Sequence, residues 1–155
     1  MVSISIVSHN GLHAMSNTAH WVSHTHKVIS LANEVLANVI NMETGKRGYL
    51  ITGKAEYLEP YNDSLIEFDN LLKEALVLTN DNQIQIKRWN KINEIKKKWV
   101  KESAIPEINL RKDVNKGNTA IQNFKMISTR TFGKLLFDKI RYNLKQLNEK
   151  YDNNL

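Results

Sequence analysis

The sequence predicts an all-α protein, an antiparallel four-helix bundle with long first and last helices. Apolar residues recur alternately at spacings of three and four through most of the 155 residues, which is the period of one helix face. Apolar and polar residues do not alternate with the two-residue period of a half-buried strand. Short stretches of turn-forming residues divide the pattern, so we expect four helices joined by tight turns.

The first helix is expected over residues 11–52, a rod of roughly 60 Å at ~1.5 Å per residue. Its core-facing stripe is predicted to contain Trp21, Thr25, Val28, Ala32, Val35, Val39, Met42, Lys46 and Tyr49. Four further apolar residues widen that stripe, as is typical of a bundle helix: Val22, Ile29, Leu36 and Leu50. A helix of this length suits a domain that stands off a membrane.

The second helix is expected to start near residues 54–56, with Pro60 close to its first turn, where a missing N–H is tolerated. Its heptad stripe is predicted to contain Leu58, Tyr61, Leu65, Phe68, Leu72, Ala75 and Thr79. Residues 79–82 form a predicted turn that supplies an N-cap for the third helix. The third helix is predicted to carry a wide apolar arc opposite its lysines, and Pro106 is expected to kink or end it. The residues on this arc are Ile86, Trp89, Ile92, Ile95, Trp99 and Val100.

Residues 115–118 are the clearest remaining break, and a fourth helix is expected over 118–153. A disturbance is indicated around 128–133, after which apolar residues resume at Leu136, Ile140, Leu144, Leu147 and Tyr151. A continuous helix here would be ~54 Å long, nearly as long as the first. Two long helices that enter and leave the bundle at one end are the geometry of a transmembrane sensor.

The net charge of +6 comes from 22 basic and 16 acidic residues, and it is concentrated in one helix. Residues 84–101 contain seven lysines and arginines and a single acidic residue, Glu94. The expected reading is a solvated helix face, with nucleic-acid or anionic-surface binding as the competing one. Trp89 and Trp99 fall on the apolar arc, so they are predicted to be core residues. The absence of cysteine fits an oxidising compartment and is equally compatible with cytoplasm.

The histidines all lie early in the chain, at His9, His13, His20, His24 and His26. A pair such as His20 and His24 shares a helix face and can chelate zinc, but a protein site normally adds a third ligand and no acidic residue precedes Glu34. We therefore expect no metal site, with His20 and His24 as the alternative. We find no nucleophile constellation or paired acid and base, so we expect neither catalysis nor a cofactor.

Residues 42–53 carry the densest set of specific residue choices. Gly45 and Gly48 lie inside a helical pattern, where each costs on the order of 1 kcal/mol relative to alanine. We expect them to permit close approach of another backbone. Glu43 and Arg47 are four residues apart and can pair on one helix face. Gly53 is a helix-stop signal, so the segment predicts a helix-to-helix corner.

This central segment reads E-T-G-x-R-G-Y-L-x-T-G, and it follows the pattern W-V-x-H-T at residues 21–25. Further matching residues are Tyr57-Leu58-Glu59-Pro60-Tyr61, Asp81-Asn82, Trp99, Pro106-Glu107-Ile108, Arg111, Gly133-Lys134 and Ile140-Arg141. Together they resemble the third CHASE family of extracellular sensory domains over nearly the whole chain. Two departures are Lys46, where many members carry glutamine or methionine, and Thr131-Phe132 in a usually glycine-rich segment.

The resemblance implies an extracytoplasmic, periplasmic sensory domain set between two membrane helices of a bacterial receptor. The motifs look most like those of methyl-accepting chemotaxis receptors, with a histidine kinase or cyclase as the alternative output and a soluble basic bundle as the competing class. Residues 1–10 are then the end of a membrane span, or an artificial chain start, and 11–155 the four-helix sensory domain. Expected partners are a second copy of the chain, a small molecule of unknown identity and the flanking membrane helices, with no nucleic acid.

A ligand site is predicted around the corner, because the Arg47 guanidinium can grip a carboxylate through two parallel hydrogen bonds. The predicted ligand-binding residues are Glu43, Arg47, Tyr49, Tyr61, Trp99 and Arg111. In the competing interpretation, Glu43 and Arg47 only pair with each other or cap a neighbouring helix.

Overall fold

The computed structural model describes the backbone of residues 3–117 and 132–152, and the side chains of residues 21–117, 134–135 and 137–146. This part of the chain forms helices and no strand, which confirms the all-α fold class. The elements are α1 (Ser3–Thr52), the 3₁₀ turn η1 (Ala55–Leu58), α2 (Glu59–Leu78), α3 (Gln83–Trp99), the π-helical turn η2 (Val100–Ala104), α4 (Ile105–Asn115) and α6 (Phe132–Asp152).

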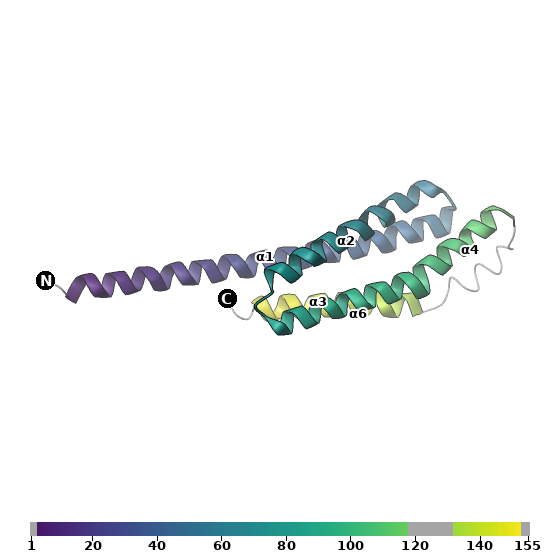
Figure 1. Ribbon diagram of the computed structural model, residues 1–155. Helices are drawn as coiled ribbons and strands as arrows, with labels where there is room; N and C mark the ends of the chain where they lie inside the picture. Colours follow the sequence, from purple (N-terminus) through teal and green to yellow (C-terminus); the bar gives the residue numbers. More distant parts are fainter. Residues whose placement is uncertain (1–2, 118–131, 153–155) are drawn as a thin grey trace.

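The helices form two antiparallel layers in one elongated bundle (Figure 1). α1 packs along α2, and α6 packs against both α3 and α1. The N-terminal part of α1 projects beyond the other helices, and the end of α6 lies near that same end of the bundle (Figure 1). The corner between α1 and α2 and the end of α4 lie at the opposite end, which we call the corner end.

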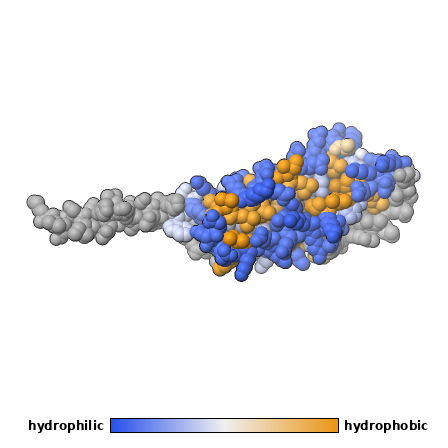
Figure 2. Space-filling model, in the orientation of Figure 1, coloured by the Kyte–Doolittle hydropathy of each residue, from blue (hydrophilic) through white to orange (hydrophobic). Residues whose placement is uncertain are grey.

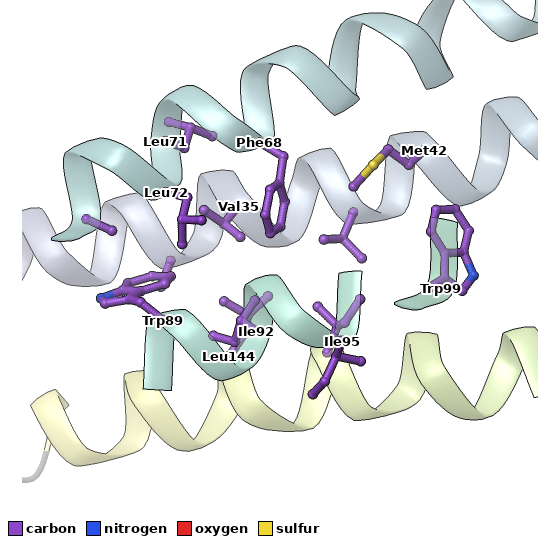
Figure 3. Packing of buried hydrophobic residues seen from close by; sticks show 14 of the residues in the cluster. Val35, Met42, Phe68, Leu71, Leu72, Trp89, Ile92, Ile95, Trp99 and Leu144 are labelled. Carbon is purple, nitrogen blue, oxygen red and sulfur yellow. The ribbon is translucent and has the colours of Figure 1, made fainter. Parts of the chain in front are cut away.

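The core consists of side chains that these helices direct toward one another, as Figure 3 shows for Val35, Phe68, Ile92 and Leu144. The predicted stripe of α1 is confirmed from Thr25 through Tyr49, since each of its residues is buried. Trp21 differs, because its side chain is 63% exposed. It lies about one turn beyond His24, whose Nε2 contacts the Leu78 carbonyl at the end of α2, so α2 does not reach it.

The starts and stops of the helices follow local chemistry. α1 ends at Thr52, and Gly53 takes a φ of 73°, which favours glycine. Pro60 lies in the first turn of α2, as the sequence predicted. Gly117, with a φ of 75°, follows α4 and confirms the break predicted over 115–118. The segment 118–131 of the expected fourth helix, including most of the predicted disturbance, lies outside the described residues.

α1 begins at Ser3 and not at the expected residue 11, so residues 3–10 belong to the first helix. Among the described helices, we find none with the length and apolar character needed to cross a bilayer.

The turn between α2 and α3 depends on Asn82, whose Oδ1 accepts hydrogen bonds from the N–H groups of Ile84 at 3.1 Å and Gln85 at 3.2 Å. Asn82→Ala is expected to lower the free energy of unfolding by about 1 kcal/mol, because two helix-start donors lose their acceptor. Urea unfolding followed by circular dichroism measures this. Asn80→Ala is the control, since Asn80 is exposed in the same turn. Equal stability of both variants would contradict the capping role.

Candidate functional site

The corner end contains a buried ion-pair cluster centred on Lys46 of α1. Lys46 is only 3% exposed, and its Nζ lies 3.1 Å from Glu43 Oε2 and 3.0 Å from Glu107 Oε2. An isolated buried ammonium costs several kcal/mol, so two carboxylates in contact are what make this position tolerable. Because Glu107 belongs to α4, the cluster ties the end of α1 to α4.

Ser103 and Pro106 explain how α4 presents Glu107. Pro106 has no N–H, and its ring clashes with the carbonyl four residues earlier in a regular α-helix. The chain opens one π-turn just before it, where the Ile105 N–H bonds to the Val100 carbonyl. Ser103 in that turn is buried, and its Oγ donates a 2.8 Å hydrogen bond to Glu107 Oε1. The Glu107 carboxylate is thus fixed on both oxygens.

Two aromatic rings border the cluster. Lys46 Nζ lies 5.0 Å from the centroid of the Trp99 ring, within the range of a cation–π contact. The Tyr61 and Trp99 ring centroids are 6.3 Å apart, in a tilted arrangement. The Tyr61 hydroxyl and the Trp99 Nε1 are both buried, and neither has a hydrogen-bond partner among the described residues. Both rings are buried, so they cover the cluster on this side.

Burial raises the pKa of Tyr61 above 10.0. The folded protein therefore keeps the phenol proton to higher pH than the unfolded chain, and this stability is present below about pH 10 and lost as pH rises through the folded pKa. Tyr61→Phe is expected to be within about 1 kcal/mol of the parent at neutral pH, because the hydroxyl has no hydrogen-bond partner among the described residues. The variant should also lose less stability than the parent above pH 10.

Urea unfolding at neutral and alkaline pH measures both effects. Tyr142→Phe is the control, because the Tyr142 side chain is 63% exposed and should leave the alkaline loss unchanged. A large loss of stability in Tyr61→Phe at neutral pH would mean that the hydroxyl has a partner in solution.

A second polar contact joins the same helices at the corner itself. Asn115 Nδ2 donates a 2.7 Å hydrogen bond to the Gly53 carbonyl, linking the end of α4 to the stop signal of α1. A Cβ on Gly53 would lie 2.5 Å from Arg111 Nη2, so a side chain there would displace the end of Arg111, whereas the φ of 73° is what favours glycine. Burial raises the pKa of Tyr49, and the positive charge of Arg111 partly opposes this rise.

The two glycines of the central segment lie against the start of the second helix. A Cβ on Gly45 would lie 2.9 Å from both the Tyr57 carbonyl oxygen and the Tyr61 nitrogen, which are backbone atoms. A Cβ on Gly48 would lie 2.6 Å from Cδ1 of the Tyr57 ring. Close approach of another backbone is therefore confirmed at Gly45, whereas Gly48 makes room for a side chain.

The structure brings together most of the predicted site residues. Those that lie in or against the polar region of the corner end are Glu43, Tyr49, Tyr61, Trp99 and Arg111. Arg47 instead has an exposed side chain, and the structure pairs Glu43 with Lys46 in place of the expected Arg47. The interpretation that Glu43 and Arg47 pair with each other is therefore corrected. Whether any of these residues binds a ligand stays a prediction.

Sequence reasoning missed Lys46, Ser103 and Glu107 as parts of one cluster. The available signal was Lys46 itself, a charged residue in the apolar stripe of α1. A lysine at a core position needs a buried partner, and Glu107 is four residues after Ser103, the spacing that lets two side chains meet on one helix face. The arrangement holds α1 and α4 together.

The weak metal alternative is limited to His24, because the His20 side chain lies outside the described residues. His24 Nε2 lies 2.9 Å from the Leu78 carbonyl oxygen, so this nitrogen is engaged with backbone. No group of three or more His, Cys, Asp or Glu side chains that could hold a metal is found in the described part of the chain.

Comparison with protein families gives a match to the CHASE3 domain over residues 18–155. Curated proteins and solved structures provide no match. The matched span contains the α1 stripe, the glycine corner, the Lys46 cluster and α6. It includes the W-V-x-H-T and E-T-G-x-R-G-Y-L-x-T-G patterns, which confirms the family that the sequence resembled. The chain belongs to the CHASE3 family, whose members are extracellular sensory domains of signalling receptors.

Proposed function

We propose that this domain is the periplasmic sensor of a bacterial inner-membrane receptor of the methyl-accepting chemotaxis type. The family supports an extracytoplasmic location. The observation that carries the proposed receptor topology is the pairing of α1 with α6, because these helices pack together and their outer ends lie at the same end of the bundle (Figure 1). Helices that leave together can continue into two neighbouring membrane spans. The chemotaxis type is proposed from the resemblance of the sequence motifs to those of chemotaxis receptors.

The proposed relay is a small displacement of α6 relative to α1. The Lys46 ion pairs and the bond from Asn115 to Gly53 fix α4 to α1 at the corner end. α6 contributes Ile140 and Leu144 to the apolar core. Apolar contacts slide with less directional cost than buried ion pairs, so a stimulus that favours one of two α6 positions would move the far end.

We also propose that the receptor is a homodimer, with α1 and α6 supplying most of the interface. The apolar side chains exposed on these helices support it: Trp21, Val22, Ile40, Leu135 and Tyr142. Figure 2 shows apolar patches between hydrophilic ones on the face it presents. An isolated domain lacks the membrane tethers that raise its effective concentration, so its self-association should be weak.

The complete reading frame tests the proposal at least cost. We expect an apolar span of ~20 residues on each side of the domain, followed by a methyl-accepting output module. A kinase or cyclase module after the second span would replace the chemotaxis assignment and keep the sensor. A reading frame without such spans would contradict the receptor.

The competing soluble, nucleic-acid-binding bundle would need aromatic residues beside its basic face. Trp89 and Trp99 are fully buried, which confirms them as core residues and leaves no stacking surface from either. Lys96 is also buried and pairs with Asp69 at 2.8 Å, so one of the seven basic residues serves the contact between α3 and α2.

A further inference from the structure

A pocket of about 470 Å³ lies between α1 and α2, well away from the Lys46 cluster. This volume is within the range of small-molecule sites, roughly 300–1,000 Å³. Its apolar wall consists of Leu31, Val77 and Leu78. Leu31 is buried, whereas Val77 is 71% exposed. The apolar wall therefore extends from the buried base of the pocket to its solvent-exposed mouth.

Charges of both signs line this pocket without pairing with each other. Lys27 comes from α1 and Glu74 from α2, and neither makes an ion pair with any described residue. Glu34, two helical turns after Lys27, accepts a 3.1 Å hydrogen bond from Ser30 Oγ. Among the described residues Lys27 and Glu74 have no ion-pair partner, so the pocket offers a cation, a carboxylate and an apolar wall. These three features complement the carboxylate, the ammonium group and the apolar side chain of an amphipathic zwitterion.

The pocket is held in shape at one end. His24 of α1 contacts the Leu78 carbonyl at 2.9 Å, which fastens the last turn of α2 to α1. Leu78 is also a wall residue, so the separation of the two helices at the pocket is set before any ligand enters. Such preorganisation reduces the ordering cost of binding.

From these observations we infer that the pocket binds an aliphatic α-amino acid in its zwitterionic form. Lys27 receives the carboxylate, Glu74 and Glu34 receive the ammonium group, and the aliphatic side chain covers Val77. A ligand with only one charge would leave either the lysine or the carboxylates without a partner. The inference rests on the proposed sensory function, and it places the ligand in this open pocket and not in the closed cluster.

Calorimetry on the 155-residue chain tests the ligand class. L-Leucine is the probe, and its two matched analogues are 4-methylpentanoate, which lacks the amine, and 3-methylbutylamine, which lacks the carboxylate. We expect leucine to bind at least 10-fold more tightly than either analogue. No leucine binding at millimolar concentration, or equal binding of one analogue, would overturn the inference.

Variants of the lining residues test whether leucine binds in this pocket. Lys27→Met and Glu74→Gln should each weaken leucine binding at least 10-fold, while Lys73→Met and Glu67→Gln, on exposed positions of α2 outside the pocket, should not. Val77→Trp should fill the pocket and abolish binding. Ile66→Trp is its control, because Ile66 is 65% exposed on the same helix and does not line the pocket.

Circular dichroism and thermal unfolding verify that each variant is folded. Unchanged leucine affinity in folded Val77→Trp would place the site elsewhere and overturn the assignment. These measurements use the isolated chain, so they are independent of the membrane topology on which the proposed function depends. If leucine does not bind but the domain is periplasmic, the inferred ligand is wrong and the proposed sensory function stands.

Discussion

Lys46→Met is expected to lower the free energy of unfolding by about 3–5 kcal/mol, the range for removing one partner of a buried ion pair. The substitution leaves the buried Glu107 carboxylate without its cation, and Met fills the space without supplying a charge. At roughly 2–4 °C per kcal/mol for a chain of this size, the melting temperature should fall by about 10 °C.

Urea unfolding followed by circular dichroism measures the loss, with Arg47→Met as the matched control. Arg47 is the adjacent cation on α1, but its side chain is exposed, so its replacement should change stability by less than about 0.5 kcal/mol. The double variant Lys46→Met with Glu107→Leu should recover part of the loss, because the orphaned carboxylate is gone. Equal stability of Lys46→Met and Arg47→Met would show that the cluster does not hold α1 to α4.

Gly45→Leu is expected to lower the free energy of unfolding by about 3 kcal/mol, at the upper part of the usual range for over-packing. The new Cβ would meet two backbone atoms at 2.9 Å, and backbone at the start of α2 cannot rotate away. Gly48→Leu meets the ring of Tyr57, which is 42% exposed and can turn toward solvent. That variant should therefore lose only about 1 kcal/mol.

Thermal and urea unfolding of the two glycine variants show which one loses more stability. Thr44→Leu is the control, because Thr44 is exposed beside Gly45 on the same helix and should be close to neutral. A Gly48→Leu variant less stable than Gly45→Leu would mean that the ring contact, and not the backbone contact, sets the geometry of the corner.

The sequence predicted those parts of the fold that depend on local periodicity. The α1 stripe from Thr25 to Tyr49 is buried, and Trp89 and Trp99 lie in the core, because a helix with one apolar face has few ways to bury it. The stop at Gly53 was equally readable, since it depends on backbone conformation at one residue. Trp21 was misplaced because helix periodicity does not show where a neighbouring helix ends.

The polar cluster was predictable only in part. Lys46 stood out as a charge in an apolar stripe, but its partner Glu107 is remote in sequence and depends on the register of α4. That register includes the extra residue of the π-turn at 100–104. Pro106 predicted a break in the helix near this position but not that the break would be a π-turn. From spacing alone, Glu43 could pair with Arg47 four residues later as well as with Lys46 three residues later. The burial of Lys46 in the structure decides in favour of Lys46.

Cysteine accessibility in the full-length receptor tests the proposed periplasmic location most directly. The chain contains no cysteine, so a single introduced thiol reports on one site of this domain. Lys73 of α2 is exposed and Ala32 of α1 is fully buried, which makes Lys73→Cys the reporter and Ala32→Cys its control. Any cysteine elsewhere in the receptor is first replaced.

The probe is a membrane-impermeant maleimide applied to intact spheroplasts. We predict that Lys73→Cys is labelled before lysis, and that Ala32→Cys is labelled only after unfolding in urea. Labelling of Lys73→Cys that requires lysis of the spheroplasts would place the domain in the cytoplasm and contradict the proposed sensor.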